Sequence, residues 1–231
     1  MKLIFVFLAL SIVLFGCQKE INFDTPSGGG GTGGGGSTGT SNSYQPLGKN
    51  SYWKYHETGT FSGDFTITST GQTRSLNGIN YTVCSASPPT SGFSEEWFGT
   101  SGHDLYSYFE GAIPNSSATI AMNFLYTNDT ASVGYQWQVP VGQANGINAV
   151  VQGSIIEKGF SLTVGGKNFD NVIHSSIVLQ YVFPGIGAMN AATYDYYVAK
   201  GVGIIRIESV GDPTFSPGVH TLADITEYSI K

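Results

Sequence analysis

Two adjacent carboxylates beside an aromatic ring form the most chemically suggestive group in the sequence: Glu95, Glu96 and Trp97. Glycosidases place a pair of carboxylates across a sugar-binding cleft, and a tryptophan there can stack on the sugar ring. A second carboxylate could come from Asp104, Glu110 or Asp195. Adjacent residues of a strand point to opposite faces, so only one of the two glutamates could face a cleft. We therefore favour an exposed edge strand kept soluble by its charges.

Nucleophiles and metal ligands are sparse. Cys84 ends a strand-like run and has no base near it in sequence, so we expect a small buried side chain. The four histidines are scattered at 56, 103, 174 and 220, without metal-site spacing. A Gly-x-Ser-x-Gly match at 35–39 lacks the strand-to-helix turn of a nucleophile elbow. These observations predict no catalytic residue, no metal and no cofactor.

Aromatic side chains crowd two segments of the chain. One holds Tyr106, Tyr108 and Phe109, and the other holds Tyr194, Tyr196 and Tyr197. On a concave sheet such rings could form a platform for a glycan or a lipid, whereas rings that point inward would be core. Phe is often buried and Tyr is intermediate, so we expect about half of them in the core. The residues predicted to bind a ligand are Trp97, Tyr106, Tyr108 and Tyr196.

Composition excludes several classes of protein. Charged residues make up 11% of the 231 residues, against about a quarter in an average protein. The net charge of −6 opposes binding to nucleic acid, which is itself a polyanion. Two cysteines cannot build a disulfide-rich scaffold.

The elements that must position these residues are predicted to be strands. Apolar and polar residues alternate with a period of two at 64–68, 136–141 and 161–164, and no convincing helical stripe occurs from Tyr44 onward. Turn signals such as Asn77-Gly78, Asn145-Gly146 and Gly165-Gly166 separate these runs. The pattern predicts a single all-β domain over 44–231, an antiparallel barrel, half-barrel or sandwich.

A faint internal repeat divides this domain into possible units 45–112 and 133–209. Trp53 precedes a Gly-x-Asn-aromatic turn at 78–81, and Trp137 precedes a similar turn at 166–169. An Asp-x-Tyr triplet follows in each unit, at 104–106 and 195–197. Duplication and coincidence both remain open, because short matches arise easily in a chain rich in Gly and Tyr.

The N-terminus has the pattern of an export signal. Lys2 is followed by an apolar run to Phe15, too short to span a bilayer, and then by Gly16-Cys17. Leu14-Phe15-Gly16-Cys17 resembles the lipobox of bacterial lipoproteins. The resemblance implies a signal peptide at 1–16, acylation of Cys17 with chains such as palmitate, and attachment to a membrane. Gln18, in place of a retaining Asp, favours the outer membrane by the same resemblance, with the periplasmic or surface face left open.

A tether is predicted at 17–43, between the acylated cysteine and the folded domain. Residues 27–43 are dominated by Gly, Ser and Thr, and they cannot bury enough apolar surface to offset the entropy of ordering. Their expected r.m.s. span is roughly 20–25 Å.

The folded part also resembles β-rich envelope lipoproteins of unknown function. The resemblance rests on Trp53-Lys54-Tyr55, on the segment 163–172 and on the segment 196–205. Our hypothesis is a membrane-anchored envelope lipoprotein that acts by binding or assembly and not by catalysis. The alternatives are a carbohydrate-binding surface protein and a carrier of hydrophobic ligands with a barrel cavity; a hydrolase lacks a motif. The protein partner and the oligomeric state stay undetermined.

Overall fold

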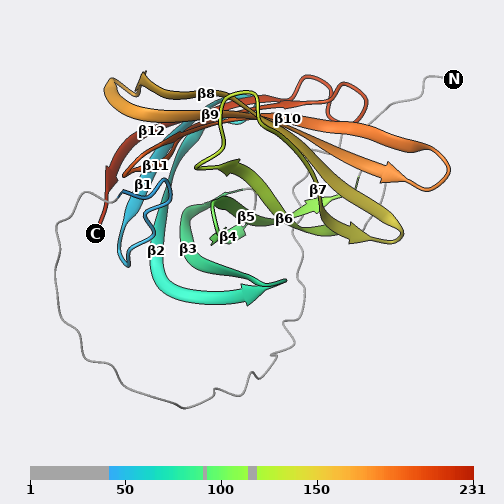
Figure 1. Ribbon diagram of the computed structural model, residues 1–231, viewed down its shortest axis with the longest axis horizontal. Helices are drawn as coiled ribbons and strands as arrows, with labels where there is room; N and C mark the ends of the chain where they lie inside the picture. Colours follow the sequence, from blue (N-terminus) through green and yellow to red (C-terminus); the bar gives the residue numbers. More distant parts are fainter. Residues whose placement is uncertain (1–41, 91–92, 114–118) are drawn as a thin grey trace, which may run out of the picture. The chain divides into compact units, whose positions relative to one another are not determined.

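Twelve β-strands make up the folded part of the chain (Figure 1). The structure, a computed structural model, describes residues 42–90, 93–113 and 119–231. The predicted signal peptide, lipobox and nearly all of the tether lie outside these residues. The strands are β1 (Tyr52–Gly59), β2 (Gly63–Leu76), β3 (Ile79–Thr90), β4 (Phe93–Ser101), β5 (Asp104–Ala112), β6 (Thr119–Asn128), β7 (Gln136–Ala144), β8 (Ile147–Val164), β9 (Lys167–Phe183), β10 (Gly187–Ala199), β11 (Gly203–Gly211) and β12 (His220–Ser229).

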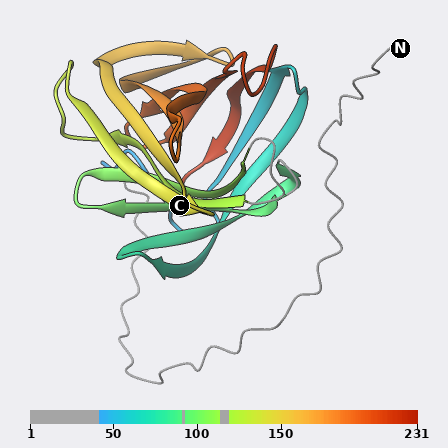
Figure 2. The same ribbon diagram turned by 90° about the vertical axis from the view of Figure 1, so that its right-hand side faces the viewer.

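The strands form one antiparallel sheet in the order β6-β5-β4-β3-β2-β1-β12-β11-β10-β9-β8-β7. Each strand pairs with its neighbour in sequence except at the β6–β7 junction, and β1 pairs with β12. The sheet curls so that its two ends, β6 and β7, come together (Figure 2). The predicted all-β antiparallel fold is therefore confirmed, in the form of a nearly closed barrel.

Two-residue turns set the register of the hairpins. Asn77 and Gly78 have φ of 52° and 80°, and Asn145 and Gly146 have φ of 52° and 77°. Positive φ at both central residues matches the right-handed twist of the flanking strands, and Asn and Gly tolerate it best. These turns join β2 to β3 and β7 to β8 as the sequence predicts.

Side chains fill the interior of the barrel. The larger core cluster includes Phe124, Tyr126, Ile177 and Tyr196, and a second cluster is built around Trp53 and Tyr55. Strand β6 contacts β8 and β9 as well as β5 and β7, and it is buried on both faces from Phe124 to Thr127. An edge strand that is covered in this way does not offer its backbone to another chain.

The described residues of the barrel belong to one compact unit. The first two matches of the proposed repeat fall on corresponding strands, since Trp53 and Trp137 lie in the first strand of each six-stranded half and the two turns follow the second. The Asp-x-Tyr triplets do not correspond, because 104–106 lies in the fifth strand of its half and 195–197 in the fourth. Duplication stays a prediction.

Within the described part of the chain, no helix is long and apolar enough to cross a membrane.

Candidate binding surface

Three side chains from neighbouring strands form a stack on the outer face of the barrel: Arg74 of β2, Trp97 of β4 and Tyr108 of β5. The Trp97 and Tyr108 rings lie 4.6 Å apart at an interplanar angle of 19°, and the Arg74 guanidinium lies 4.6 Å from the Trp97 ring centre. Trp97 and Tyr108 face each other because the β4–β5 register pairs them. We call these three residues the outer stack.

The outer stack leaves little of the indole faces open. Strand β4 lies between β2 and β5 in the sheet, so Arg74 and Tyr108 approach the Trp97 ring from opposite sides. The Tyr81 ring packs against both Trp97 and Tyr108 and is itself fully buried. What the stack offers to solvent is therefore mostly ring edge and guanidinium.

Carboxylates surround the outer stack. Glu95 accepts a hydrogen bond of 3.2 Å from Trp97 Nε1 and lies 3.3 Å from Arg74 in an ion pair. The Tyr108 hydroxyl donates to Glu110 at 3.4 Å. Partial burial, and then the negative charge of Glu110, raise the pKa of Tyr108, so this hydroxyl stays a hydrogen-bond donor at neutral pH. The surface around the outer stack therefore combines aromatic rings with hydrogen-bond donors and acceptors.

The structure brings together three of the four residues predicted to bind a ligand. Tyr106 lies two residues from Tyr108, half-buried, with its hydroxyl 3.4 Å from Asp104. Tyr196 lies apart from them, in the core, where it is 7% exposed and stacks on Tyr126 at 5.1 Å. Ligand binding by these residues stays a prediction, and Tyr196 would need the core to open.

The expectation of an edge strand at Glu95 and Glu96 is wrong, because β4 pairs with β3 on one side and with β5 on the other. The adjacent glutamates do point to opposite faces, as strand geometry requires. Glu95 is on the outside with the outer stack, whereas the charge of Glu96 adds to the raised pKa values of the buried residues Cys84 and Tyr196. Burial is the main cause of the shift at Cys84 and raises its pKa to about 12. This thiol is therefore neutral and shielded, consistent with a packing role.

Every histidine of the chain is paired with a carboxylate. The pairs are His56–Asp64 at 2.6 Å, His103–Asp129 at 2.8 Å, His174–Asp195 at 2.9 Å and His220–Glu208 at 2.9 Å. Among the described residues no group of three or more His, Cys, Asp or Glu is placed to hold a metal ion.

Several of these groups lie in one row across the outside of the sheet. Strand register places His174 opposite Tyr197, Tyr197 opposite Arg206, and Arg206 opposite Asp224. His174 stacks on Tyr197 at 4.2 Å, and Arg206 makes two hydrogen bonds to Asp224, of 2.5 and 2.7 Å. Because neighbouring side chains in the row pair with one another, we assign the row to sheet stabilisation.

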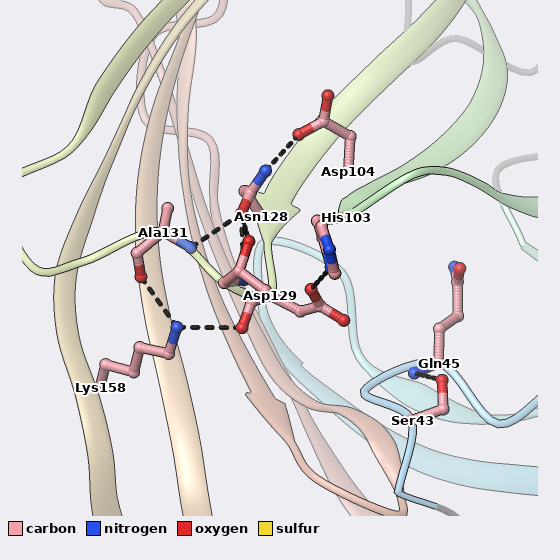
Figure 3. Close-up of polar contacts among 9 residues, drawn as sticks. Ser43, Gln45, His103, Asp104, Asn128, Asp129, Ala131 and Lys158 are labelled. Carbon is pink, nitrogen blue, oxygen red and sulfur yellow. Dashed lines mark hydrogen bonds and ion pairs between the residues drawn. The ribbon is translucent and has the colours of Figure 1, made fainter.

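A polar network fastens the β6–β7 turn (Figure 3). Asn128 donates to Asp104 and accepts from the Thr130 and Ala131 N–H groups, which closes the turn. Lys158 of β8 donates to the carbonyl oxygens of Asp129 and Ala131 at 2.9 and 2.8 Å. Strands β6 and β7 do not pair with each other, and the two charge-assisted hydrogen bonds of Lys158 instead connect the β6–β7 turn to β8.

Arg74 is the main residue of this surface that the sequence analysis missed. The sequence does predict one neighbour of Arg74. Counting residues outward from the Asn77-Gly78 turn places Arg74 opposite Tyr81 in the β2–β3 hairpin. The contact of Arg74 with Trp97 spans β3, because Trp97 lies in β4. The register of the β2–β3 hairpin alone does not predict a contact with β4.

Comparisons with known proteins reach only distant structures. A scan against protein-family models finds no match, and neither does a search of curated proteins. A solved structure of a protein assigned as exported, with a YmcC-like fold, from Bacteroides fragilis is 7% identical, with a TM-score of 0.45, over 80% of this chain and 98% of the other. A protein assigned as a lipoprotein, from Parabacteroides distasonis, is 8% identical, with a TM-score of 0.42 and the same coverage. These likenesses are too distant to transfer a function.

Proposed function

We propose that this chain is a lipid-anchored envelope protein that binds a protein partner through the outer stack and does no chemistry itself. Acylated Cys17 would anchor it, in the outer membrane by the resemblance of the lipobox region. The observation that carries the binding role is the Arg74–Trp97–Tyr108 stack, which stands on the outer face of a barrel with a filled core.

The composition of the outer stack supports a protein partner. Trp, Tyr and Arg are the residues that most often dominate the energy of protein interfaces. A saccharide would need an open aromatic face, and both faces of Trp97 are covered by Arg74 and Tyr108. Ring edges, a guanidinium and the nearby carboxylates suit a partner with its own side chains and backbone groups to pair.

Neither alternative function finds comparable support. A carrier of hydrophobic ligands needs a cavity of about 300 Å³ or more. The hollow lined by Trp53, Tyr55 and Phe98 measures about 20 Å³. A saccharide-binding protein would have to use the far side of Tyr108 or displace Arg74 from the indole.

The test is site-specific photo-cross-linking of the full chain in cells that make it. A photoreactive residue replaces Glu110, at the rim of the outer stack, and we expect a protein adduct that disappears with Arg74→Ala or Trp97→Ala. Truncating such a residue typically costs about 2 kcal/mol or more, which is about a 30-fold loss of affinity.

A matched control is built into the chain. Lys54 lies 5.8 Å from the Tyr52 ring, and both side chains hydrogen-bond Glu227, so this exposed cluster has the same composition of cation, ring and carboxylate. A photoreactive residue at Glu227 should give no matching adduct. Equal adducts at both positions, no adduct at Glu110, or binding of a saccharide that quenches Trp97 fluorescence would contradict a protein partner.

A further inference from the structure

A short segment, residues 43–47, crosses the end of the barrel beside the β10–β11 turn, and we call it the strap. The Ser43 carbonyl oxygen accepts a hydrogen bond of 2.8 Å from the Gly201 N–H in that turn. The Gln45 side-chain amide lies 3.5 Å from the Tyr106 carbonyl oxygen of β5. Since β5 and β10–β11 are far apart in the order of the sheet, the strap links opposite parts of the barrel.

Beneath the strap lies a small hollow of about 20 Å³. Its lining includes Gln45 and Leu47 of the strap together with Trp53, Tyr55 and Tyr126 of the barrel. A cavity needs about 10–15 Å³ to hold one water molecule. The hollow therefore has room for a water and is too small for an organic ligand.

Two buried oxygen atoms belong to residues that line this hollow. Gln45 is 8% exposed and Tyr126 is fully buried. Among the described residues, neither Gln45 Oε1 nor the Tyr126 hydroxyl has a hydrogen-bond partner. Buried polar atoms in folded proteins nearly always have a partner, either protein or ordered water.

The other two polar side chains that line the hollow, Trp53 and Tyr55, are already engaged. Trp53 Nε1 donates to the Val202 carbonyl oxygen at 2.6 Å, and the Tyr55 hydroxyl donates to the Ile204 carbonyl oxygen at 2.8 Å. Burial raises the pKa of Tyr126 well above its usual value, so its hydroxyl keeps its proton. One donor, the Tyr126 hydroxyl, and one acceptor, Gln45 Oε1, are thus left without a partner on residues that line a space of water size.

We propose that the hollow is a binding site for one structural water that bridges Tyr126 and Gln45. The Tyr126 hydroxyl donates to the water oxygen, and the water donates one of its protons to Gln45 Oε1. The water completes the attachment of the strap, which then holds the β10–β11 turn through Ser43, β5 through the Gln45 amide, and β6 through the water. The tether would thereby join the barrel at a segment fixed on three sides.

A crystal structure of the full chain tests the site directly. We expect a water peak within about 2.7–3.0 Å of both Gln45 Oε1 and the Tyr126 hydroxyl oxygen. Density that shows no water between these atoms, or a Gln45 side chain turned to bond the Tyr126 hydroxyl directly, would overturn the proposal.

Urea unfolding of the full chain provides the second test, as a double-mutant cycle of Gln45→Leu and Tyr126→Phe. Because one water serves both groups, each change should lower the urea midpoint, and the double variant should lose less than the sum of the two shifts. Tyr181→Phe is the control, since Tyr181 does not line the hollow and its hydroxyl bonds the Ala112 carbonyl oxygen, and its effect should add to that of Gln45→Leu. Strict additivity of the Gln45 and Tyr126 changes would argue that no water joins them.

Discussion

The environment of each side chain, more than its residue type, sets its chemistry in this barrel. Cys84 and Tyr196 face a filled interior, and burial raises the pKa of both. Trp97 is held at the surface by Arg74 and Tyr108. Glu95 and Glu96 are neighbours in sequence, yet Glu95 pairs with Arg74 of the outer stack, whereas the charge of Glu96 acts on the buried Cys84.

Cys84 should resist thiol reagents in the native protein. With a pKa of about 12, only about one thiol in ten thousand is ionised at pH 8, and the side chain has no exposed surface. We expect peptide mass spectrometry to find almost no alkylation of Cys84 in buffer and full alkylation in concentrated urea. Rapid native labelling at Cys84 would show that the core opens readily.

Asp195 should make stability depend on pH in the acid range. Its pKa is lowered, mainly because His174 donates a hydrogen bond to the carboxylate. The stabilisation is therefore present above the ordinary Asp value of 3.8 and is lost as the pH falls below it towards the lowered native pKa. The urea midpoint of the native chain should exceed that of Asp195→Asn at pH 5. The difference should shrink as the pH falls below 4; a difference that is as large at pH 2 as at pH 5 would refute the assignment.

At the scale of strands, the barrel depends on how its two ends meet. Strand β6 is buried on both faces from Phe124 to Thr127, and β7 reaches β6 without a ladder of strand pairing. Gly142 of β7 allows the approach, because a Cβ there would overlap the carbonyl oxygen of Ala121 in β6. Gly142 does not have a positive φ, so the reason for a glycine here is the close approach of the two backbones and not the backbone conformation.

Gly142→Ala should therefore weaken the seam between β6 and β7. Forcing a methyl group against packed backbone costs roughly 1–3 kcal/mol, which urea unfolding would report as a lower free energy of unfolding. Gly63→Ala is the control, since a Cβ at Gly63 meets no atom within 4 Å, and its effect should stay within about 0.5 kcal/mol. Equal effects of the two changes would exclude a tight seam.

At the scale of the whole molecule, the folded unit and the proposed anchor at Cys17 would have separate tasks. Side chains fill the interior of the barrel, and the outer stack lies on its outside. Such an architecture needs no large movement to present a binding surface, and the tether, with its expected span of roughly 20–25 Å, would supply the reach. The proposed attachment through Cys17 would keep the outer stack in the cell envelope.

Cys17→Ser should release the protein from the membrane fraction. Two or three acyl chains anchor a protein stably, and without them the chain has no lipid attachment. Fractionation followed by immunodetection measures the change, with Cys84→Ala as the control that should stay with the membrane. A Cys17→Ser protein that still sediments with the membrane would contradict the lipid anchor.

Local features of this protein follow from its sequence alone. Alternating residues defined strands, and Asn-Gly turns fixed the hairpin register, because both signals arise between near neighbours in the chain. Opposite faces for Glu95 and Glu96 followed from the same pleat. Aromatic residues at 97, 106 and 108 were recognised as candidates without knowledge of their partners.

Which rings are core and which are surface depends on how the whole sheet closes. Tyr108 and Tyr196 have the same side chain in similar aromatic runs, yet one stacks outside on Trp97 and the other inside on Tyr126. The curl of twelve strands determines which face of each becomes the interior, and the same curl brings Gln45 over Tyr126 across 81 positions of sequence. Such long-range contacts follow from closure of the whole sheet, which local patterns do not encode.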